Sequence, residues 1–322
     1  MIRFVTVRLL QAIPVLLAVG LIAFCLFNYA GDPVTGLLGQ DYTEANRLAM
    51  VQALGLDQPL LERYGHFLVA AAHGQFGVSY RLGRPVLDLF AERVPATVEL
   101  AAVATLLGLT VGIPLGIHTA VHPRSAISRL LGGISLLGVS LPSFLTGLLL
   151  VAVFSVWLRW LPSFGRGQTV ALGGWTTGLL TRSGLLSLVL PALTLGSFQV
   201  TLVMRLVHAQ MQDALGTEHV RFARARGLSR RIVNTRHALQ TASVPVITAV
   251  ALQFGTTVAF SIVTEQVFQW PGTGLLLVGA VQSADIPVMT AYLISSAVLF
   301  LAVNLVADIA CFAADPRTRA AA

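Results

Sequence analysis

Charged residues are absent from long stretches of the chain, and these stretches are rich in Leu, Val, Ile, Ala and Phe. A membrane-spanning helix needs ~20 predominantly apolar residues, so each uninterrupted stretch of this length is a candidate span. Six qualify, and they run from Leu9 to Gly31, Leu100 to Pro123, Leu130 to Leu158, Ser183 to Met204, His237 to Thr264 and Ile286 to Ala307. The pattern therefore predicts an all-α polytopic membrane protein with six transmembrane helices.

These spans divide the chain into three parts. Residues 1–31 are expected to form an N-terminal transmembrane helix, which is retained because its apolar run exceeds the ~7–15 residues of a cleaved signal. Residues 32–99 are expected to form an extracytoplasmic segment, in which EANRLAMVQALGL and PLLERYGHFLVAAAHG are typical of short helices. Residues 100–322 are expected to form a core with five further spans and a cytoplasmic segment at 205–241.

The segment EQVFQWPGTGLLLVGAVQSADIP, residues 265–287, is apolar but interrupted by Pro and Gly, so it is too broken to span a bilayer. Irregular backbone at membrane depth is tolerated where protein or a water-filled cavity covers it. Two interpretations stay open: a partly re-entrant element that lines a pathway, and an amphipathic helix on the outer surface. The candidate residues for a pathway or outer gate are Glu265, Trp270, Pro271, Gly272 and Asp285.

Composition supports a membrane protein, because only 11% of residues are charged, against ~25% in a soluble domain. The net charge of +7 would suggest a nucleic-acid partner in a soluble protein, but membrane proteins gather Arg in cytoplasmic loops. With the N-terminus inside, the predicted cytoplasmic pieces hold 13 arginines and the longer outer pieces hold 8. We therefore expect cytoplasmic termini, a lipid bilayer as partner and no nucleic acid.

Motifs for catalysis are absent: the sequence contains no GxxxxGK[ST] phosphate loop, no HExxH and no GxSxG. His118 and His122 have helical spacing but no third ligand, which favours an interfacial pair over a zinc site. The acidic residues that could form a proton or ion relay lie near predicted helix ends, where interfacial placement is expected; they are Glu99, Glu265, Asp285 and Asp308. The sequence thus predicts a non-catalytic chain without a metal or cofactor of its own.

The run TEHVRFARARGLSRR, from Thr217, combines arginines with helix caps. Thr217 is placed as an N-cap, Gly227 as a helix stop and Ser229 as the cap of a second helix. Phe222, Ala223 and Arg226 have the spacing of one helix face, and the small residues around them would admit a second surface closely. A loop that only sets topology explains the arginines but does not require a capped helix, a glycine bend and another capped helix.

This cytoplasmic run resembles the signature of permease subunits of binding-protein-dependent ABC importers, in the peptide and nickel branch. That branch reads (D/E)-Y-V-R-T-A-R-A-K-G-L-S before a basic stretch, R-H-A-L and a later Pro, and the chain has EHVRFARARGLS, RHAL and Pro245. Its departures are His219, Phe222 and Arg226. LGLDQPLLERY, GVSLPSFLTGLLL, EQVFQWPGTG and the terminal DPRTR from Asp315 also resemble their counterparts, in the same order.

The resemblance implies a type I ABC importer (MetI-like) permease fold in the bacterial cytoplasmic (inner) membrane. It implies as partners a second homologous permease subunit, two ATPase subunits that bind ATP and Mg²⁺, and an extracytoplasmic solute-binding protein. A coupling helix at 218–226 would insert into the ATPase, and the residues assigned to this contact are Glu218, Arg221, Phe222, Ala223, Arg224, Ala225, Arg226 and Gly227. Di- or oligopeptides are the first substrate choice, ahead of glutathione and nickel complexes.

Two other functional classes compete with this interpretation. An ion-driven secondary transporter would show buried titratable groups and internal repeats with broken central helices, and no clear pair of such helices is found. A structural or receptor subunit without a pathway is disfavoured by the resemblance alone.

Overall fold

The computed structural model describes residues 2–29, 43–53 and 57–314. Its long helices are α1 (Ile2–Tyr29), α5 (Val86–Val121), α8 (Arg182–Leu215), α11 (Leu239–Phe268) and α13 (Ile286–Ala314). The shorter helices are α3 (Glu44–Ala53), α4 (Leu60–Ala72), α6 (Ala126–Ser140), α7 (Ser143–Leu150), α9 (Glu218–Ala225), α10 (Arg230–Ile232) and α12 (Thr273–Gln282). Two π-helical segments, η1 (Val151–Trp157) and η2 (Val233–Ala238), and two strands, β1 (Val170–Leu172) and β2 (Trp175–Thr177), complete the described part.

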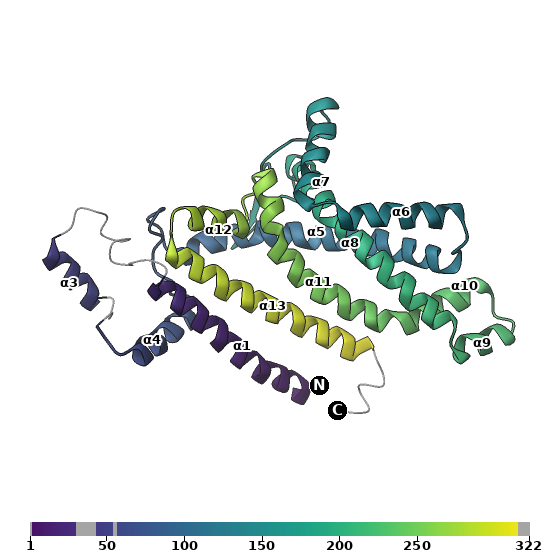
Figure 1. Cartoon of the computed structure of the whole chain (residues 1–322), viewed down its shortest axis with the longest axis horizontal. Coiled ribbons are helices and arrows are strands. Elements are labelled where there is room, and N and C mark those ends of the chain that lie inside the picture. The colour runs from purple at the N-terminus through teal and green to yellow at the C-terminus, as the bar shows by residue number, and fades with distance from the viewer. Residues whose placement is uncertain (1, 30–42, 54–56, 315–322) are drawn as a thin grey trace.

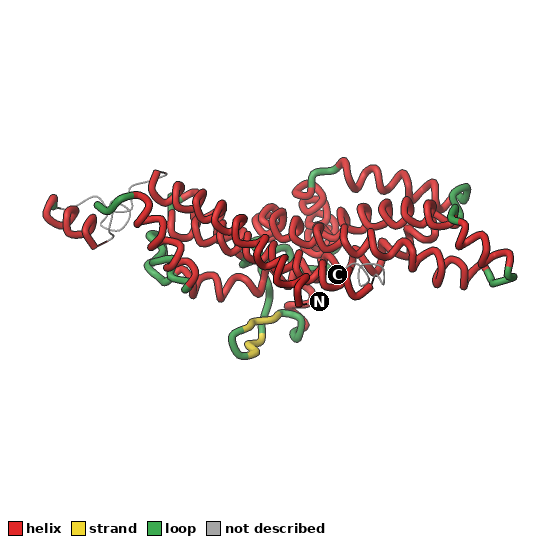
Figure 2. Tube along the Cα trace, turned by 90° about the horizontal axis from the view of Figure 1, so that it is seen from below, coloured by secondary structure: helices red, strands yellow, loops and turns green. Residues whose placement is uncertain are grey.

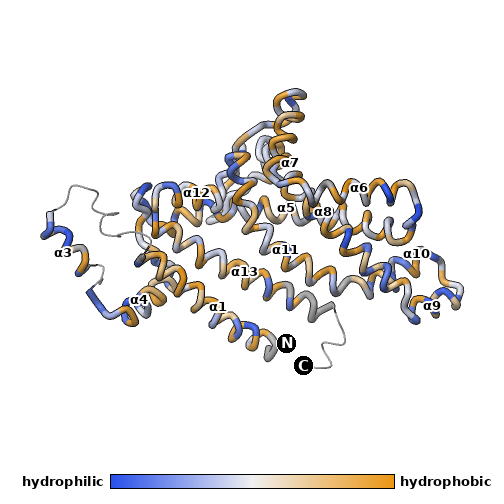
Figure 3. The backbone as a smooth tube through the Cα atoms, viewed as in Figure 1, coloured by the Kyte–Doolittle hydropathy of each residue, from blue (hydrophilic) through white to orange (hydrophobic). Residues whose placement is uncertain are grey.

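The long helices run along the length of the molecule, with α3 and α4 at one end and α9 and α10 at the other (Figure 1). The strands pair antiparallel, with Ala171 opposite Thr176, and this hairpin projects from the helical layer (Figure 2). Sequence patterning did not predict it. Hydrophobic residues cover most of each long helix, whereas hydrophilic residues gather on α3 and around α9 (Figure 3). This distribution is that expected of helices that meet lipid along their length.

Five described helices are long and apolar enough to cross a membrane. These spans are Val5–Asn28, Val86–Val121, Arg182–Leu215, Pro245–Phe268 and Ile286–Val306. The prediction of one continuous span from Leu130 to Leu158 was wrong, because α6 ends at Ser140 and α7 begins at Ser143 in another direction (Figure 1). Pro142 lacks an N–H and disfavours helical backbone at Leu141, which breaks the helix. The count of six spans therefore stays a prediction.

Two of the long helices extend beyond the apolar stretches that predicted them. α5 has 36 residues, about 54 Å at 1.5 Å per residue, which exceeds the ~30 Å hydrocarbon core of a bilayer. It begins at Val86, ahead of the predicted start at Leu100, and α8 continues past Met204 to Leu215. Charge-free stretches measure the part of a helix in hydrocarbon and not the whole helix. The prediction therefore began α5 too late and ended α8 too early.

Glycines bring α5 and α8 into close contact. Gly108, Gly112 and Gly116 recur every fourth residue along α5 and face α8. A Cβ atom added to Gly112 would lie 2.9 Å from the Val203 Cβ atom, and one added to Gly116 would lie 2.6 Å from the Val207 Cβ atom. Small residues in this pattern let membrane helices approach backbone to backbone, where van der Waals contact stabilises their packing. α5 and α8 therefore form the closest helix pair of the core.

The segment between α1 and α5 contains the two short helices expected from its sequence. α4 packs on α1 through Phe24, whose ring centroid lies 5.4 Å from that of Tyr64 and 5.8 Å from that of Phe67. The Tyr64 hydroxyl donates a hydrogen bond of 2.7 Å to the Leu17 carbonyl. α4 is thus fixed to α1, while residues 30–42 and 54–56 of the segment lie outside the described residues.

Candidate coupling surface and buried polar clusters

α9 is a short helix held between α8 and the start of α11. Only Gly216 and Thr217 separate it from α8. Thr217 occupies the N-cap position, but its hydroxyl donates to the Ala214 carbonyl at 2.7 Å and makes no cap bond to α9. The expected side-chain cap by Thr217 was therefore wrong; this hydroxyl closes the end of α8 instead. The connection is short enough to make α9 follow any movement of α8.

The bend after α9 agrees with the sequence. Gly227 has φ +77°, and its N–H donates to the Arg224 carbonyl at 3.0 Å. Glycine adopts this left-handed conformation without a Cβ clash, so the helix ends here. The Ser229 hydroxyl then accepts a bond of 3.4 Å from the Ile232 N–H, as expected of the cap of the next helix. A helix, a glycine bend and a second capped helix are thus confirmed.

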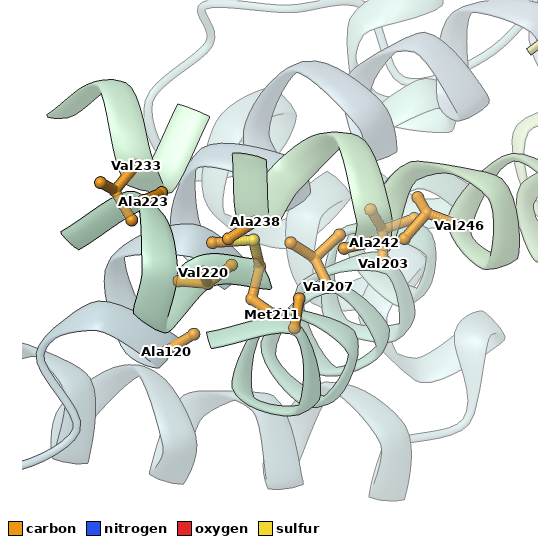
Figure 4. Close-up of a cluster of buried hydrophobic side chains, with 11 residues drawn as sticks. Ala120, Val203, Val207, Met211, Val220, Ala223, Val233, Ala238, Ala242 and Val246 are labelled. Atoms are coloured by element: carbon orange, nitrogen blue, oxygen red, sulfur yellow. The ribbon is translucent and has the colours of Figure 1, made fainter. Parts of the chain in front are cut away.

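The inner face of α9 belongs to the chain's own hydrophobic core. Val220 is fully buried and Ala223 is 4% exposed. Both pack in a cluster whose other members are Ala120, Val203, Val207, Met211, Ala214, Val233, Ala238, Ala242 and Val246 (Figure 4). Ala223 does not share an outer face with Phe222 and Arg226, so the expectation that it seats a partner is corrected. Burial of Ala223 fixes α9 to α8 and α11.

The outer face of α9 carries the remaining candidates. The exposed residues are Glu218, Arg221, Phe222, Arg224, Ala225, Arg226 and Gly227. Phe222 is 64% exposed, and the Arg226 guanidinium lies 5.9 Å from the centre of its ring. Arg221 pairs with Glu218 at 3.6 Å. The surface therefore offers one large apolar side chain among cations, a composition that suits an acidic partner with an apolar recess.

A buried carboxylate, Glu265, lies near the other end of α11. Its Oε1 atom accepts from the Thr97 hydroxyl of α5 at 2.7 Å, and its Oε2 atom accepts from the Leu275 N–H of α12 at 2.9 Å. Trp270 is also fully buried, and its indole N–H donates to the Ala96 carbonyl at 2.9 Å. Glu265 and Trp270 thus join α11, α12 and α5 at one place, which the sequence did not reveal because Thr97 and Glu265 are 168 residues apart.

Gly272 and Pro271 complete the turn that leads into α12. Gly272 is buried against Glu265, while Pro271 is half-buried. Asp285 belongs to a separate cluster: it accepts from the Ser79 hydroxyl and from the N–H groups of Tyr80 and Arg81, the last two at 3.2 and 3.3 Å. Of the predicted gate residues, the structure brings together Glu265, Trp270 and Gly272, and it places Asp285 elsewhere.

An ion pair between Glu99 and Arg166 was not predicted. Their side chains are 3% and 6% exposed, and Arg166 also donates to the Thr176 carbonyl of β2 at 2.8 Å. The signal in the sequence is Gly165-Arg166-Gly167, because both glycines have positive φ and allow the tight turns that aim Arg166 inward. The pair fastens the hairpin to α5.

The acidic residues expected at the interface are mostly inside the fold. Glu99, Glu265 and Asp285 are 5%, 0% and 2% exposed, and each has hydrogen-bond donors. Asp308 instead pairs with Arg8 of α1 at 2.9 Å, which holds α1 against α13. The chain itself thus covers the first three, and donors distant in sequence compensate their burial, while their placement at the membrane interface stays a prediction. The rings of His118 and His122 are 5.1 Å apart, and the described residues contain no group of three metal-binding side chains.

Two family descriptions cover nearly the whole chain. Residues 112–320 match "Binding-protein-dependent transport system inner membrane component", and residues 1–101 match the N-terminal region of such membrane components. The chain belongs to this permease family. The expected family is thus confirmed, and with it the class of polytopic membrane protein.

The permease has full-length relatives among characterised transporters. It is 36% identical over 321 residues to the glutathione transport system permease protein of Escherichia coli K12, with 99% of each chain covered. It is 33% identical over 336 residues to the dipeptide transport system permease protein of the same strain, again with 99% coverage. Each similarity covers 99% of both chains, so it includes the segments that form α6, α7 and α12 in the permease.

A solved structure shows the same fold. An inward-facing crystal form of a methionine ABC transporter, MetNI, aligns with a TM-score of 0.55 at 17% identity, covering 70% of the permease and 96% of the matched chain. The MetI-like fold is therefore confirmed. Membership in the family makes the permease a membrane subunit of a binding-protein-dependent ABC importer of the bacterial inner membrane, which works with ATPase and solute-binding partners.

Proposed function

We propose that the permease forms half of the translocation pathway of an ATP-driven importer of di- or oligopeptides. A second homologous permease forms the other half, and two ATPase subunits bind ATP and Mg²⁺. The solute-binding protein delivers the peptide from outside. Two end-to-end relatives, named for dipeptide and glutathione transport, support short peptides as the substrate class. In this proposal the ATPase subunits, and not the permease, bind the cofactors and hydrolyse ATP.

The observation that supports the coupling role is that α9 has one buried face and one exposed face. Its inner face, Val220 and Ala223, packs against α8 and α11, while Phe222 and the arginines of its outer face are exposed. A rigid body of this kind transfers force between a bound partner and two long helices. ATP-driven closure of the ATPases would displace α9 and, through it, the helices that line the pathway. In this arrangement both termini and α9 lie in the cytoplasm.

In this scheme the predicted gate residues fix the positions of neighbouring backbone segments. Glu265, Trp270 and Gly272 are buried inside the chain, and Asp285 holds residues 79–81. They would shape the outer side of the pathway without touching the peptide, and Pro271 fixes the turn between them.

Reconstitution of the complete transporter tests this function. Proteoliposomes with the permease, its partner permease and the ATPases should accumulate a labelled dipeptide only when ATP is inside and the solute-binding protein outside. Omission of either component should abolish uptake. Uptake driven by an ion gradient through the permease alone would overturn the proposal in favour of secondary transport.

Replacing Gly227 with Val should uncouple ATP hydrolysis from transport. A non-glycine residue at φ +77° costs about 1–2 kcal/mol, and a β-branched residue more, so the bend after α9 will rearrange. Open space surrounds Gly227, which leaves the backbone conformation as the cause. We expect normal membrane insertion and ATPase activity, but transport per ATP lowered about tenfold.

Gly227→Asn is the matched control, because Asn tolerates the left-handed conformation better than other residues with a side chain. It should retain most of the coupling. Equal loss in both variants would show that the glycine is needed for contact with the ATPase and not for its backbone conformation.

A further inference from the structure

The start of α12 is capped by a residue of another helix. Gly272 occupies the N-cap position and has no side chain to bond the free N–H groups of the first turn. The Glu265 carboxylate takes this place by accepting from the Leu275 N–H at 2.9 Å. A negative charge at a helix N-terminus also interacts favourably with the helix dipole. α12 therefore depends on α11 for its first turn.

The close approach of α12 to Glu265 requires glycine. A Cβ atom on Gly272 would lie 2.3 Å from Glu265 Oε1, and one on Gly274 would lie 2.9 Å from Oε2. Thr97 of α5 joins the same cluster, since its hydroxyl donates to Glu265 and accepts from the Thr273 N–H at 2.8 Å. Three helices are thus fixed to each other around one buried carboxylate.

The opposite end of α11 reaches the coupling helix. Ala242 and Val246 of α11 lie in the same hydrophobic cluster as Val220 and Ala223 of α9 (Figure 4). α11 is continuous from Leu239 to Phe268, about 45 Å at 1.5 Å per residue. η2 leads directly into α11 and contacts α9, so this continuous helical segment meets α9 at its start and carries Glu265 close to its end.

We propose that Glu265 is a positioning residue that makes α12 and the adjoining part of α5 move with α11 when α9 is displaced. This inference rests on the proposed function, and it names the helices through which a displacement of α9 is transmitted. Because the carboxylate is fully buried, it cannot exchange its donors for water, and the three helices stay joined during the movement. Loss of the acceptor frees α12 while leaving α9 and its ATPase contact in place.

Two isosteric replacements test this in the complete reconstituted transporter. Glu265→Gln keeps the shape but loses the charge and one acceptor, and Thr97→Val removes the hydroxyl at nearly constant volume. We expect basal ATPase activity to remain within twofold of the wild type, whereas the stimulation by solute-binding protein should fall about tenfold. Thr97→Ser, which restores the hydroxyl, should restore stimulation, and Glu92→Gln, at an exposed acid of α5, should change neither rate. Unchanged stimulation in Thr97→Val and Glu265→Gln would overturn the proposal.

Hydrogen exchange separates this proposal from the proposed function. In the assembled complex, the amides of residues 273–276 should be protected in the wild type and in Thr97→Ser, and at least tenfold less protected in Glu265→Gln. This outcome does not require dipeptide uptake. Failure of uptake alone would therefore argue against the proposed peptide substrate, and not against the capping of α12 by Glu265. Equal protection in all variants would overturn the role of Glu265. Thr97→Val keeps nearly the native side-chain volume. Its ATPase stimulation can therefore be compared with that of the wild type and Thr97→Ser even if a Glu265 variant folds poorly.

Discussion

Glu99→Ala should lower the free energy of unfolding of the permease by about 3–5 kcal/mol, the usual cost of removing one partner from a buried ion pair. The variant leaves the Arg166 guanidinium, 6% exposed, without its countercharge. It also removes the acceptor of the Gly178 N–H, 3.2 Å from the Glu99 Oε1 atom. Hydrogen bonds from Arg166 to Thr176 remain, but they supply no negative charge. Thermal unfolding of the purified chain in detergent measures the loss.

An exposed pair of the same chemistry is the matched control. Arg84 and Glu92 are joined by two hydrogen bonds, one more than Arg166 and Glu99, but their side chains are 49% and 53% exposed. Water and salt screen such a pair, so Glu92→Ala should change the unfolding temperature little. The double variant Glu99→Ala with Arg166→Ala should be less destabilised than the sum of the single variants, because no charge is left unpaired. Additive losses would show that the two side chains act through packing and not through their charges.

The parts of the fold that follow from local chemistry could be predicted. Apolar stretches located the long helices, and Gly227 with Ser229 located the bend and the second cap after α9. The break at Pro142 was also visible in the sequence, but counting charge-free residues ignores proline. A length criterion based on hydrocarbon thickness cannot report where a helix continues beyond the hydrocarbon, which is why the start of α5 and the end of α8 were misplaced.

The contacts that define the clusters could not be predicted, because they join residues far apart in sequence. Glu99 meets Arg166 of a loop whose path depends on the hairpin, and Glu265 meets Thr97 of α5. Each acid near a helix end could equally have faced the interface. Ala223 was misassigned for a related reason: a small residue permits close approach on either face, and only the folded chain shows that this approach is internal.

Gly116→Ala should destabilise the permease by about 1–3 kcal/mol, the typical cost of overpacking a filled interior, and Gly116→Val should cost more. The added Cβ atom would lie 2.6 Å from the Val207 Cβ atom and 2.7 Å from the Met204 carbonyl oxygen of α8. Neither is the end of a flexible side chain, so the two helices themselves must separate. The measurement is the unfolding temperature of the purified chain in detergent, together with ATP-driven uptake by the reconstituted transporter.

Gly132→Ala on α6 is the matched control, because a Cβ atom added there meets nothing within 4 Å. Both replacements gain the ~1 kcal/mol by which Ala exceeds Gly in helix propensity, so their difference isolates the contact between α5 and α8. Gly132→Ala should leave stability unchanged or raise it. If Gly116→Ala also left stability unchanged or raised it, α5 and α8 could separate at little cost, and their packing would not transmit force. If it destabilises as expected, α5 is held so tightly to α8 that a displacement of α9, two residues beyond α8, must move both helices.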